Sequence, residues 1–261
     1  CWIVLAGGSG RGGGGGDRGD SPTTCAGATD SEDGEAPEAE TDSEDDYGHR
    51  FDPDETVVIF DWDDTMLPSS WVQDRALRID GGGGSGPALA ISEADRAALR
   101  ALAGRVGETL RLAKQLGTVV LVTNAERGWI ELSCARFLPA VSPVLESVKL
   151  LSARSQYERP GVLAPFEWKL SAFGHEVGRL LASSEGWARR RKNVISIGDS
   201  AHEREALLRV TASLPNCRTK SLKFVERPSI DQLCRQHQLI SRCIRRIVHH
   251  NGNLDLCINA S

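Results

Sequence analysis

Residues Val57–Thr65 read VVIFDWDDT, a short run of β-branched and aromatic side chains that ends in a cluster of acidic residues. A continuous apolar run of this length is typical of a strand buried on both faces, as in a parallel sheet. Carboxylates directly after such a strand lie at its carboxyl end, where ligands bind in open parallel sheets. This stretch therefore predicts both the class of fold and the position of a site.

Four further runs along the chain resemble this one and predict strands. They are Thr118–Val122, Val148–Leu151, Val194–Ile197 and the more polar Ser221–Val225, which suits an edge strand. Helical spacing of apolar residues predicts helices at about 92–116, 127–137, 167–181, 202–209 and 229–249. Strands that alternate with helices indicate a three-layer α/β fold with a Rossmann-like parallel sheet.

The chain combines an acidic N-terminal segment with a basic remainder. Residues 1–56 hold 15 acidic and 3 basic side chains, a net charge of −12, and the other residues hold 21 acidic and 28 basic side chains, a net charge of +7. Residues 1–54, with the glycine run Gly12–Gly16 and the acidic run Asp30–Asp46, contain few large apolar groups. This composition predicts a disordered tail over 1–54, because such a segment buries too little apolar surface to offset its ordering entropy.

Length and composition exclude several classes of protein. The chain has 261 residues, 40% hydrophobic and 26% charged, which indicates a globular protein of one or two domains. No apolar stretch approaches the roughly 18 residues of a membrane-spanning helix, so we expect no membrane partner. Seven cysteines without a CxxC pair favour free thiols in a reducing compartment, and hence a cytoplasmic location, although the chain begins with Cys1 and not with methionine.

Polar residues stand at the ends of three predicted strands. Asp61 and Asp63 follow the first strand, Thr123 follows the second, and Asp199 follows the fourth within a Gly-Asp-Ser sequence. A lone Asp at a strand end is more often a turn or N-cap residue, but several strand ends with suitable residues favour a site. Carboxylates that converge there repel one another unless a cation lies between them, and oxygen ligands suit Mg²⁺.

With these residues the sequence resembles the haloacid dehalogenase-like (HAD) superfamily of hydrolases. Four motifs of that family occur in the family's order over about residues 55–226. They are Val57–Thr65 for the DxDx[T/V] motif, Val119–Asn124 for the strand ending in Ser or Thr, Lys169 for the lysine and Gly198–Glu203 for the acidic fourth motif. The resemblance implies a catalytic domain over 55–228, followed by a C-terminal helical extension over 229–261.

The resemblance implies an enzyme, a phosphatase of the phosphoric monoester type. The second Asp of the DxD pair implies phosphoryl transfer, because members of the family that cleave carbon–halogen bonds lack it. Asp61 would attack phosphorus and form an aspartyl-phosphate, and Asp63 would act as general acid and then as general base. Thr123 and Asn124 would bind the phosphoryl group, and Lys169 would neutralise charge around it.

The resemblance also implies a Mg²⁺ site. Its ligands would be Asp61, the backbone carbonyl of Asp63, and Asp199. Glu203 would either bind the ion directly or orient the ion's water ligands. Asp64 stands where many members of the family have Gly, and it would either strengthen metal binding or raise the pKa of a neighbour.

Other residues compete for these roles. Lys149 lies inside a predicted strand and Lys192 precedes another as a solvated loop charge, so Lys169 has the best register for the lysine role. His175 and His202 are the histidines nearest the motifs, and we expect them to cap, pack or face water.

HAD-like enzymes choose substrates through cap insertions, and this sequence has little room for one. The intervals 66–117 and 125–168 are filled by predicted helices, a strand and loops, which implies a minimal cap or none. An open site suits a bulky phosphorylated substrate, such as a phosphoprotein. Trp71 and Trp129, which lie close to the first two motifs, would line its rim or pack in the core.

Two basic runs raise the question of nucleic-acid binding. Arg189–Lys192 and Arg242–Arg246 concentrate positive charge, but no aromatic interleaving or nucleic-acid motif accompanies them. We therefore expect a solvated face, or a docking surface for the acidic segment, and no nucleic-acid partner. The alternative function is a non-catalytic binding module that presents charged surfaces.

Overall fold

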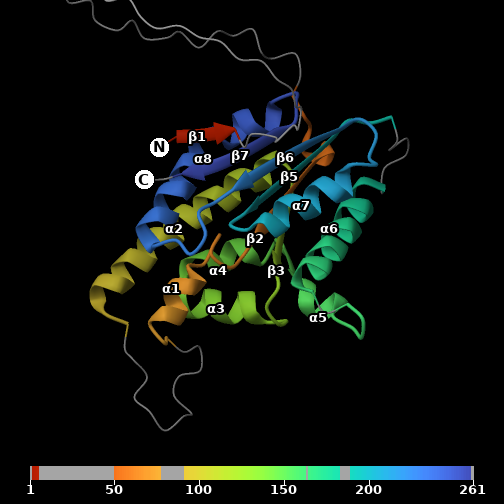
Figure 1. Ribbon diagram of the computed structural model, residues 1–261. Helices are drawn as coiled ribbons and strands as arrows, with labels where there is room; N and C mark the ends of the chain where they lie inside the picture. Colours follow the sequence, from red (N-terminus) through yellow and green to blue (C-terminus); the bar gives the residue numbers. More distant parts are fainter. Residues whose placement is uncertain (1, 6–49, 78–90, 163, 183–188, 260–261) are drawn as a thin grey trace, which may run out of the picture. The chain divides into compact units, whose positions relative to one another are not determined.

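The computed structural model describes residues 2–5, 50–77, 91–162, 164–182 and 189–259. These residues form an α/β fold in which one sheet carries helices on both faces (Figure 1). The sheet has the strand order β1-β7-β6-β5-β2-β3-β4. Its neighbouring strands are parallel, except that β1 is antiparallel to β7. The α/β class and the Rossmann-like parallel sheet are thereby confirmed.

The described strands are β1 (Trp2–Leu5), β2 (Thr56–Asp61), β3 (Thr118–Thr123), β4 (Lys149–Ser152), β5 (Lys192–Gly198), β6 (Cys217–Lys223) and β7 (Leu254–Asn259). Five of them match predicted runs, while β1 and β7 are new. The prediction that Ser221–Val225 forms an edge strand is wrong, because β6 pairs with β5 on one side and β7 on the other. Polarity misled that prediction, since Lys220 and Ser221 are buried in spite of their polar groups.

The described α-helices are α1 (Ser69–Asp74), α2 (Glu93–Leu116), α3 (Trp129–Phe137), α4 (Ser142–Leu145), α5 (Ala153–Tyr157), α6 (Pro165–Ala182), α7 (Ala201–Thr211) and α8 (Ile230–His249), with 3-10 turns η2 (Pro53–Glu55) and η3 (Pro139–Val141). The five predicted helices are confirmed within a few residues. Side chains of Ser92, Ser200 and Ser229 accept hydrogen bonds from first-turn backbone N–H groups, which sets where α2, α7 and α8 begin. Gly117 ends α2 next to β2, because a Cβ there would lie 2.6 Å from the carbonyl oxygen of Thr56.

Alternating side chains of the strands divide the core into two layers. Val58 and Phe60 belong to the cluster formed with α2 and α8, whereas Val57 and Ile59 belong to the cluster formed with α6 and α7. Figure 1 shows these two pairs of helices on opposite faces of the sheet. Asp61 continues the second series, so its side chain lies on the face covered by α6 and α7.

The segment before β2 differs in part from the predicted tail over 1–54. Trp2–Leu5 pairs with β7, and Phe51 is only 3% exposed, so both ends of that range join the fold. A single aromatic side chain in a polar segment was too weak a signal to predict this contact. Residues 6–49, which the composition predicts to be disordered, lie outside the described residues.

The C-terminal part is integral to the fold and not an appended extension over 229–261. The buried side chains Leu233, Ile240 and Ile244 of α8 belong to the main core cluster, and β7 pairs with β6. Between β2 and α6, the described residues form α1 to α5, η3 and two strands, with no independent cap domain among them. None of the described helices has the length and apolar character needed to cross a membrane.

Candidate active site

Three central strands bring the predicted site residues to one edge of the sheet. β2 lies between β3 and β5, and both pairs are parallel. Asp61 ends β2, Thr123 ends β3, and Asp199 directly follows the end of β5. The chain runs outward from β2 to β3 and β4 and then returns to the other side of β2 as β5. Such a reversal of strand order leaves a crevice at the carboxyl ends of the strands.

A buried lysine lies at the centre of this edge. Lys169 Nζ is 2.9 Å from Asp61 Oδ1, and it also contacts Glu203 Oε1. The Lys169 side chain is 5% exposed and projects from the same face of α6 as the buried Ala172 and Phe173. A buried ammonium is costly unless it is paired, so the two carboxylates account for a lysine at a core position.

Glu203 is held in place from the start of α7. Its Oε2 accepts hydrogen bonds from the Ser200 backbone N–H at 3.0 Å and from the Ser200 hydroxyl at 2.6 Å. A Cβ on Gly198 would lie 2.5 Å from Glu203 Cγ, so only glycine fits at the end of β5. Because Oε1 contacts Lys169, both carboxylate oxygens of Glu203 are engaged.

Asp63 is turned toward β3 and α3. The Thr123 hydroxyl donates a hydrogen bond to Asp63 Oδ2 at 2.6 Å, and the Trp129 indole N–H donates one to Oδ1 at 2.9 Å. The Ala125 backbone N–H donates to Thr123 Oγ1 at 3.0 Å, which orients the hydroxyl. Both oxygens of Asp63 are therefore held by donors from the second motif and the helix that follows it.

Asp64 ties the turn after β2 to the start of α1. Its φ of 51° is in the left-handed region, which Asp tolerates better than most residues. Asp64 Oδ1 accepts a hydrogen bond from the Ser70 backbone N–H at 2.8 Å, and Oδ2 contacts the Ser70 hydroxyl. The charge of Asp64 also contributes to raising the pKa of Asp199, which is one of the two roles expected from its position.

Negative charge exceeds positive charge at this edge. Burial raises the pKa of Asp61 well above its usual value, since the opposing effect of Lys169 is smaller and Glu203 and Asp63 add to the shift. Burial, followed by the charge of Glu203, raises the pKa of Asp199 to about 7. Burial acts against the ionised form of Glu203 too, but the charge and hydrogen bond of Lys169, together with hydrogen bonds from Ser200 and the backbone, lower that pKa. The site therefore favours a further cation.

The donor atoms at the edge fit Mg²⁺ better than a metal that needs many protein ligands. Within the described ranges, no three His, Cys, Asp or Glu side chains are grouped to hold a metal ion. Mg²⁺ keeps several waters and usually takes one or two carboxylates. The carboxylates of Asp61 and Asp199 could supply these, together with the Asp63 carbonyl. Glu203 has both oxygens engaged, which suits orientation of Lys169 better than direct ligation.

The remaining residues considered for the site lie in different places. Asn124 follows β3, and its buried Oδ1 has no hydrogen-bond partner among the described residues. Lys149 Nζ is 2.6 Å from the buried Glu176 of α6. The prediction that Lys192 is a solvated loop charge is wrong, because it is 2% exposed and donates to the carbonyls of Arg190 and Pro215. Backbone carbonyls at the ends of elements can satisfy an ammonium where no carboxylate is near.

Sequence patterns did not single out His237, which supports the first motif from α8. Its Nε2 lies 2.8 Å from the Thr65 carbonyl oxygen, and its Nδ1 lies 3.1 Å from Thr109 Oγ1. A carbonyl only accepts, so Nε2 carries the proton, and burial lowers the pKa of His237 to about 4. His237 is 172 positions from Thr65, and no local pattern links them. His175 and His202 are exposed, as expected.

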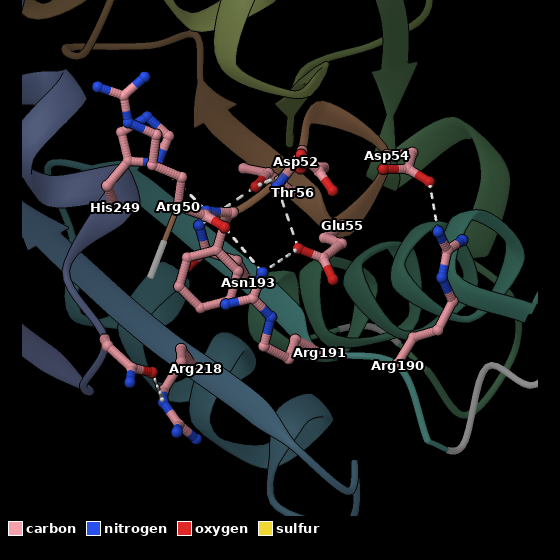
Figure 2. A network of polar contacts seen from close by, with 12 residues as sticks. Arg50, Asp52, Asp54, Glu55, Thr56, Arg190, Arg191, Asn193, Arg218 and His249 are labelled. Atoms are coloured by element: carbon pink, nitrogen blue, oxygen red, sulfur yellow. Dashed lines mark hydrogen bonds and ion pairs between the residues drawn. The ribbon is translucent and has the colours of Figure 1, made fainter. Parts of the chain in front are cut away.

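The basic run Arg189–Lys192 lies at the opposite, amino end of the strands. Figure 2 shows Arg190 facing Asp54 and Arg191 facing Glu55, with N···O distances of 2.9 and 3.1 Å. Both carboxylates belong to the segment that leads into β2. These two arginines thus form ion pairs within the fold.

Fold and site together define an α/β protein with a buried lysine–carboxylate centre at the carboxyl edge of a parallel sheet. No protein-family model, no curated protein and no solved structure matches the chain. Function has therefore to be inferred from the chemistry of the site itself.

Proposed function

We propose that the chain is a Mg²⁺-dependent phosphatase of the HAD-like class, which hydrolyses phosphomonoesters through an aspartyl-phosphate on Asp61. The observation that carries this proposal is the buried Lys169 ammonium 2.9 Å from Asp61 Oδ1. A fixed cation beside a strand-end carboxylate offsets the repulsion between that carboxylate and an incoming phosphoryl group. The order of the four sequence motifs supports the same class.

In the first step, a carboxylate oxygen of Asp61 forms a bond to phosphorus. The bond from phosphorus to the ester oxygen breaks, and its electron pair takes a proton from the Asp63 carboxyl group. Thr123 and Asn124 bind oxygens of the phosphoryl group in this proposal. Lys169 balances the negative charge, and Glu203 keeps the ammonium in place.

In the second step, water attacks phosphorus and the bond to Asp61 breaks. Asp63, now a carboxylate, takes the proton of the water, and phosphate leaves. Bound Mg²⁺ would neutralise charge on the phosphoryl oxygens, with Asp61, Asp199 and the Asp63 carbonyl as its protein ligands. The raised pKa values of Asp61 and Asp199 support a cation at this position.

A bulky phosphomonoester such as a phosphoprotein is the substrate class that the open edge suits best. In the intervals 66–117 and 125–168, the described residues form helices, strands and connecting loops of the main fold, and no independent cap domain is among them. A small, enclosed pocket would instead require an element to cover the carboxyl edge of the sheet.

The test compares wild type with Asp61→Asn on an aryl phosphate, with and without Mg²⁺. Asn is nearly isosteric but a poor nucleophile, so turnover should fall by more than about 1000-fold while the melting temperature is kept or raised. Asp231→Asn, at an exposed position of α8, is the matched control and should keep full activity. Equal activity of wild type and Asp61→Asn would overturn the mechanism.

A non-catalytic binding module is the second candidate. It rests on the same buried Lys169 ammonium, which would attract a phosphorylated group whether or not hydrolysis follows. This reading predicts that wild type binds phosphate or a phosphorylated partner but turns over no phosphomonoester, even with saturating Mg²⁺. The same assay therefore separates the two candidates.

A further inference from the structure

Trp129 makes a polar contact that neither rim lining nor core packing explains. It is the first residue of α3 and half-buried, and its indole N–H donates a hydrogen bond to Asp63 Oδ1 at 2.9 Å. Thr123 donates to the other oxygen of the same carboxylate at 2.6 Å. A donor on each oxygen leaves the plane of the Asp63 carboxylate little freedom to rotate.

The backbone of Trp129 is tied to the next turn of α3. Ser133 is fully buried, and its hydroxyl donates a hydrogen bond to the Trp129 carbonyl oxygen at 2.6 Å. The same hydroxyl accepts from the indole N–H of the buried Trp62 at 3.0 Å. Trp62 and Asp63 are neighbours, so successive turns of α3 hold both residues. This arrangement gives α3 a rigid hold on the first motif.

The two donors to Asp63 differ in what they can do when the carboxyl group gains a proton. An indole N–H can only donate, whereas a hydroxyl can donate or accept. Oδ1, which faces Trp129, must therefore remain an acceptor in both states. Oδ2, which faces Thr123, can carry the proton and still accept from the Thr123 hydroxyl, which leaves the proton available to the leaving oxygen.

We propose that Trp129 is a positioning residue that orients Asp63 and assigns proton transfer to Oδ2. This inference rests on the proposed phosphatase function, in which Asp63 protonates the leaving oxygen. Trp129 touches no reacting atom and acts only through Asp63. Without its N–H, the carboxyl group rotates more freely and its proton is divided between two oxygens, of which one is directed toward α3.

The kinetic test uses Trp129→Phe, which removes the N–H but keeps an aromatic ring. Protonation of the leaving oxygen matters most for poor leaving groups, so kcat/KM for phenyl phosphate should fall about tenfold or more. For 4-nitrophenyl phosphate, whose leaving group needs little protonation, the fall should be less than about threefold. Trp71→Phe is the matched control, because Trp71 packs on the core beneath the Arg75 guanidinium. This variant should leave kcat/KM unchanged for both substrates. Equal losses on both substrates would show a merely structural role and overturn the proposal.

A spectroscopic test needs no activity. The indole N–H resonance of Trp129, assigned with Trp129→Phe, should lie downfield in the wild-type NMR spectrum and move upfield in Asp63→Ala. An unchanged resonance in Asp63→Ala would overturn the contact, whether or not the protein is a phosphatase. A shifted resonance in a protein that is inert with Mg²⁺ would instead refute the proposed function, and with it the catalytic use of this contact.

Discussion

The carboxyl and amino ends of the central strands both bury charged side chains, but they balance them differently. At the amino end, Lys220 is fully buried and donates to the Val248 carbonyl oxygen at 2.7 Å, while Lys192 donates to two other carbonyls. At the carboxyl end, the carboxylates of Asp61 and Glu203 both contact Lys169. At the amino end the buried lysines donate to backbone oxygens, whereas at the carboxyl end the buried lysine is paired with acidic side chains.

At the amino end, buried cationic side chains are satisfied by groups of the protein itself. Val248 lies in the last turn of α8, where carbonyl groups have no partner within the helix. Lys220 and the Asn193 side chain both donate to its oxygen. Nearby, Arg190 and Arg191 pair with the carboxylates of Asp54 and Glu55 (Figure 2). At the carboxyl end the carboxylates have hydrogen-bond donors, but among the site residues described above they outnumber the Lys169 ammonium. Such an excess costs stability, and groups with strongly shifted pKa values gather at functional sites in many proteins, which is the basis of the proposed function.

The largest difference in stability is expected between variants of two buried lysines, Lys169 and Lys220. Lys169→Met leaves Asp61 and Glu203 buried without their cation, so it should lower the free energy of unfolding by about 3–5 kcal/mol. Lys220→Met should change it by less than about 1 kcal/mol, because Asn193 still donates to Val248. Urea denaturation at pH 7 of both variants measures the difference. Similar losses in both would mean that the ends do not differ as described.

Mg²⁺ should stabilise the protein through the carboxyl end alone. At 100 times its dissociation constant, an ion that binds only the folded form adds about 2.7 kcal/mol. Because the pKa of Asp199 is about 7, the metal must displace a proton at pH 6 but not at pH 8, so the shift in melting temperature should be larger at pH 8. Asp199→Ala should reduce the shift, as calorimetric titration can check. Equal Mg²⁺ affinity in both proteins would place Asp199 outside the site.

The buried Lys220 at the amino end should make stability depend on pH in alkaline solution. Burial lowers the pKa of Lys220 from 10.5 to about 7, so between these values the unfolded chain binds a proton that the folded chain lacks. The contribution of Lys220 to stability therefore rises as the pH increases from about 7 to about 10. Over this range the unfolding free energy of wild type should therefore rise relative to that of Lys220→Met. Parallel curves would show that Lys220 does not titrate there.

The smallest effect is expected for an exposed ion pair at the amino end. Arg190 and Asp54 are 2.9 Å apart, but their side chains are 44% and 58% exposed. Solvent screens such a pair, so Arg190→Ala should cost no more than about 0.5 kcal/mol at physiological salt. Thermal unfolding at low and high salt provides the measurement. A loss of several kcal/mol would show that this pair stabilises the fold far more than an exposed ion pair should.

The sequence by itself determined five of the strands, the five long helices and the edge of the sheet where the site residues gather. These features depend on short-range patterns, which are apolar runs for strands, a 3.6-residue spacing for helices and serine side chains at their N-termini. Asp61, Thr123 and Asp199 could be placed at one edge because parallel strands share a direction. Each of these inferences needs only neighbouring residues and a rule of topology.

Only the tertiary structure decided which side chains meet. Trp129 reaches Asp63 across 66 positions and His237 reaches Thr65 across 172, and neither pairing leaves a periodic signal. Lys220 directly precedes the polar run Ser221–Val225, which predicts an edge strand, yet Lys220 is buried because β7 continues the sheet beyond β6 and α8 offers it a carbonyl. Partners of buried polar groups depend on how distant elements pack. A buried polar or charged group must be paired, and its partner is an atom that the packing brings near it in space.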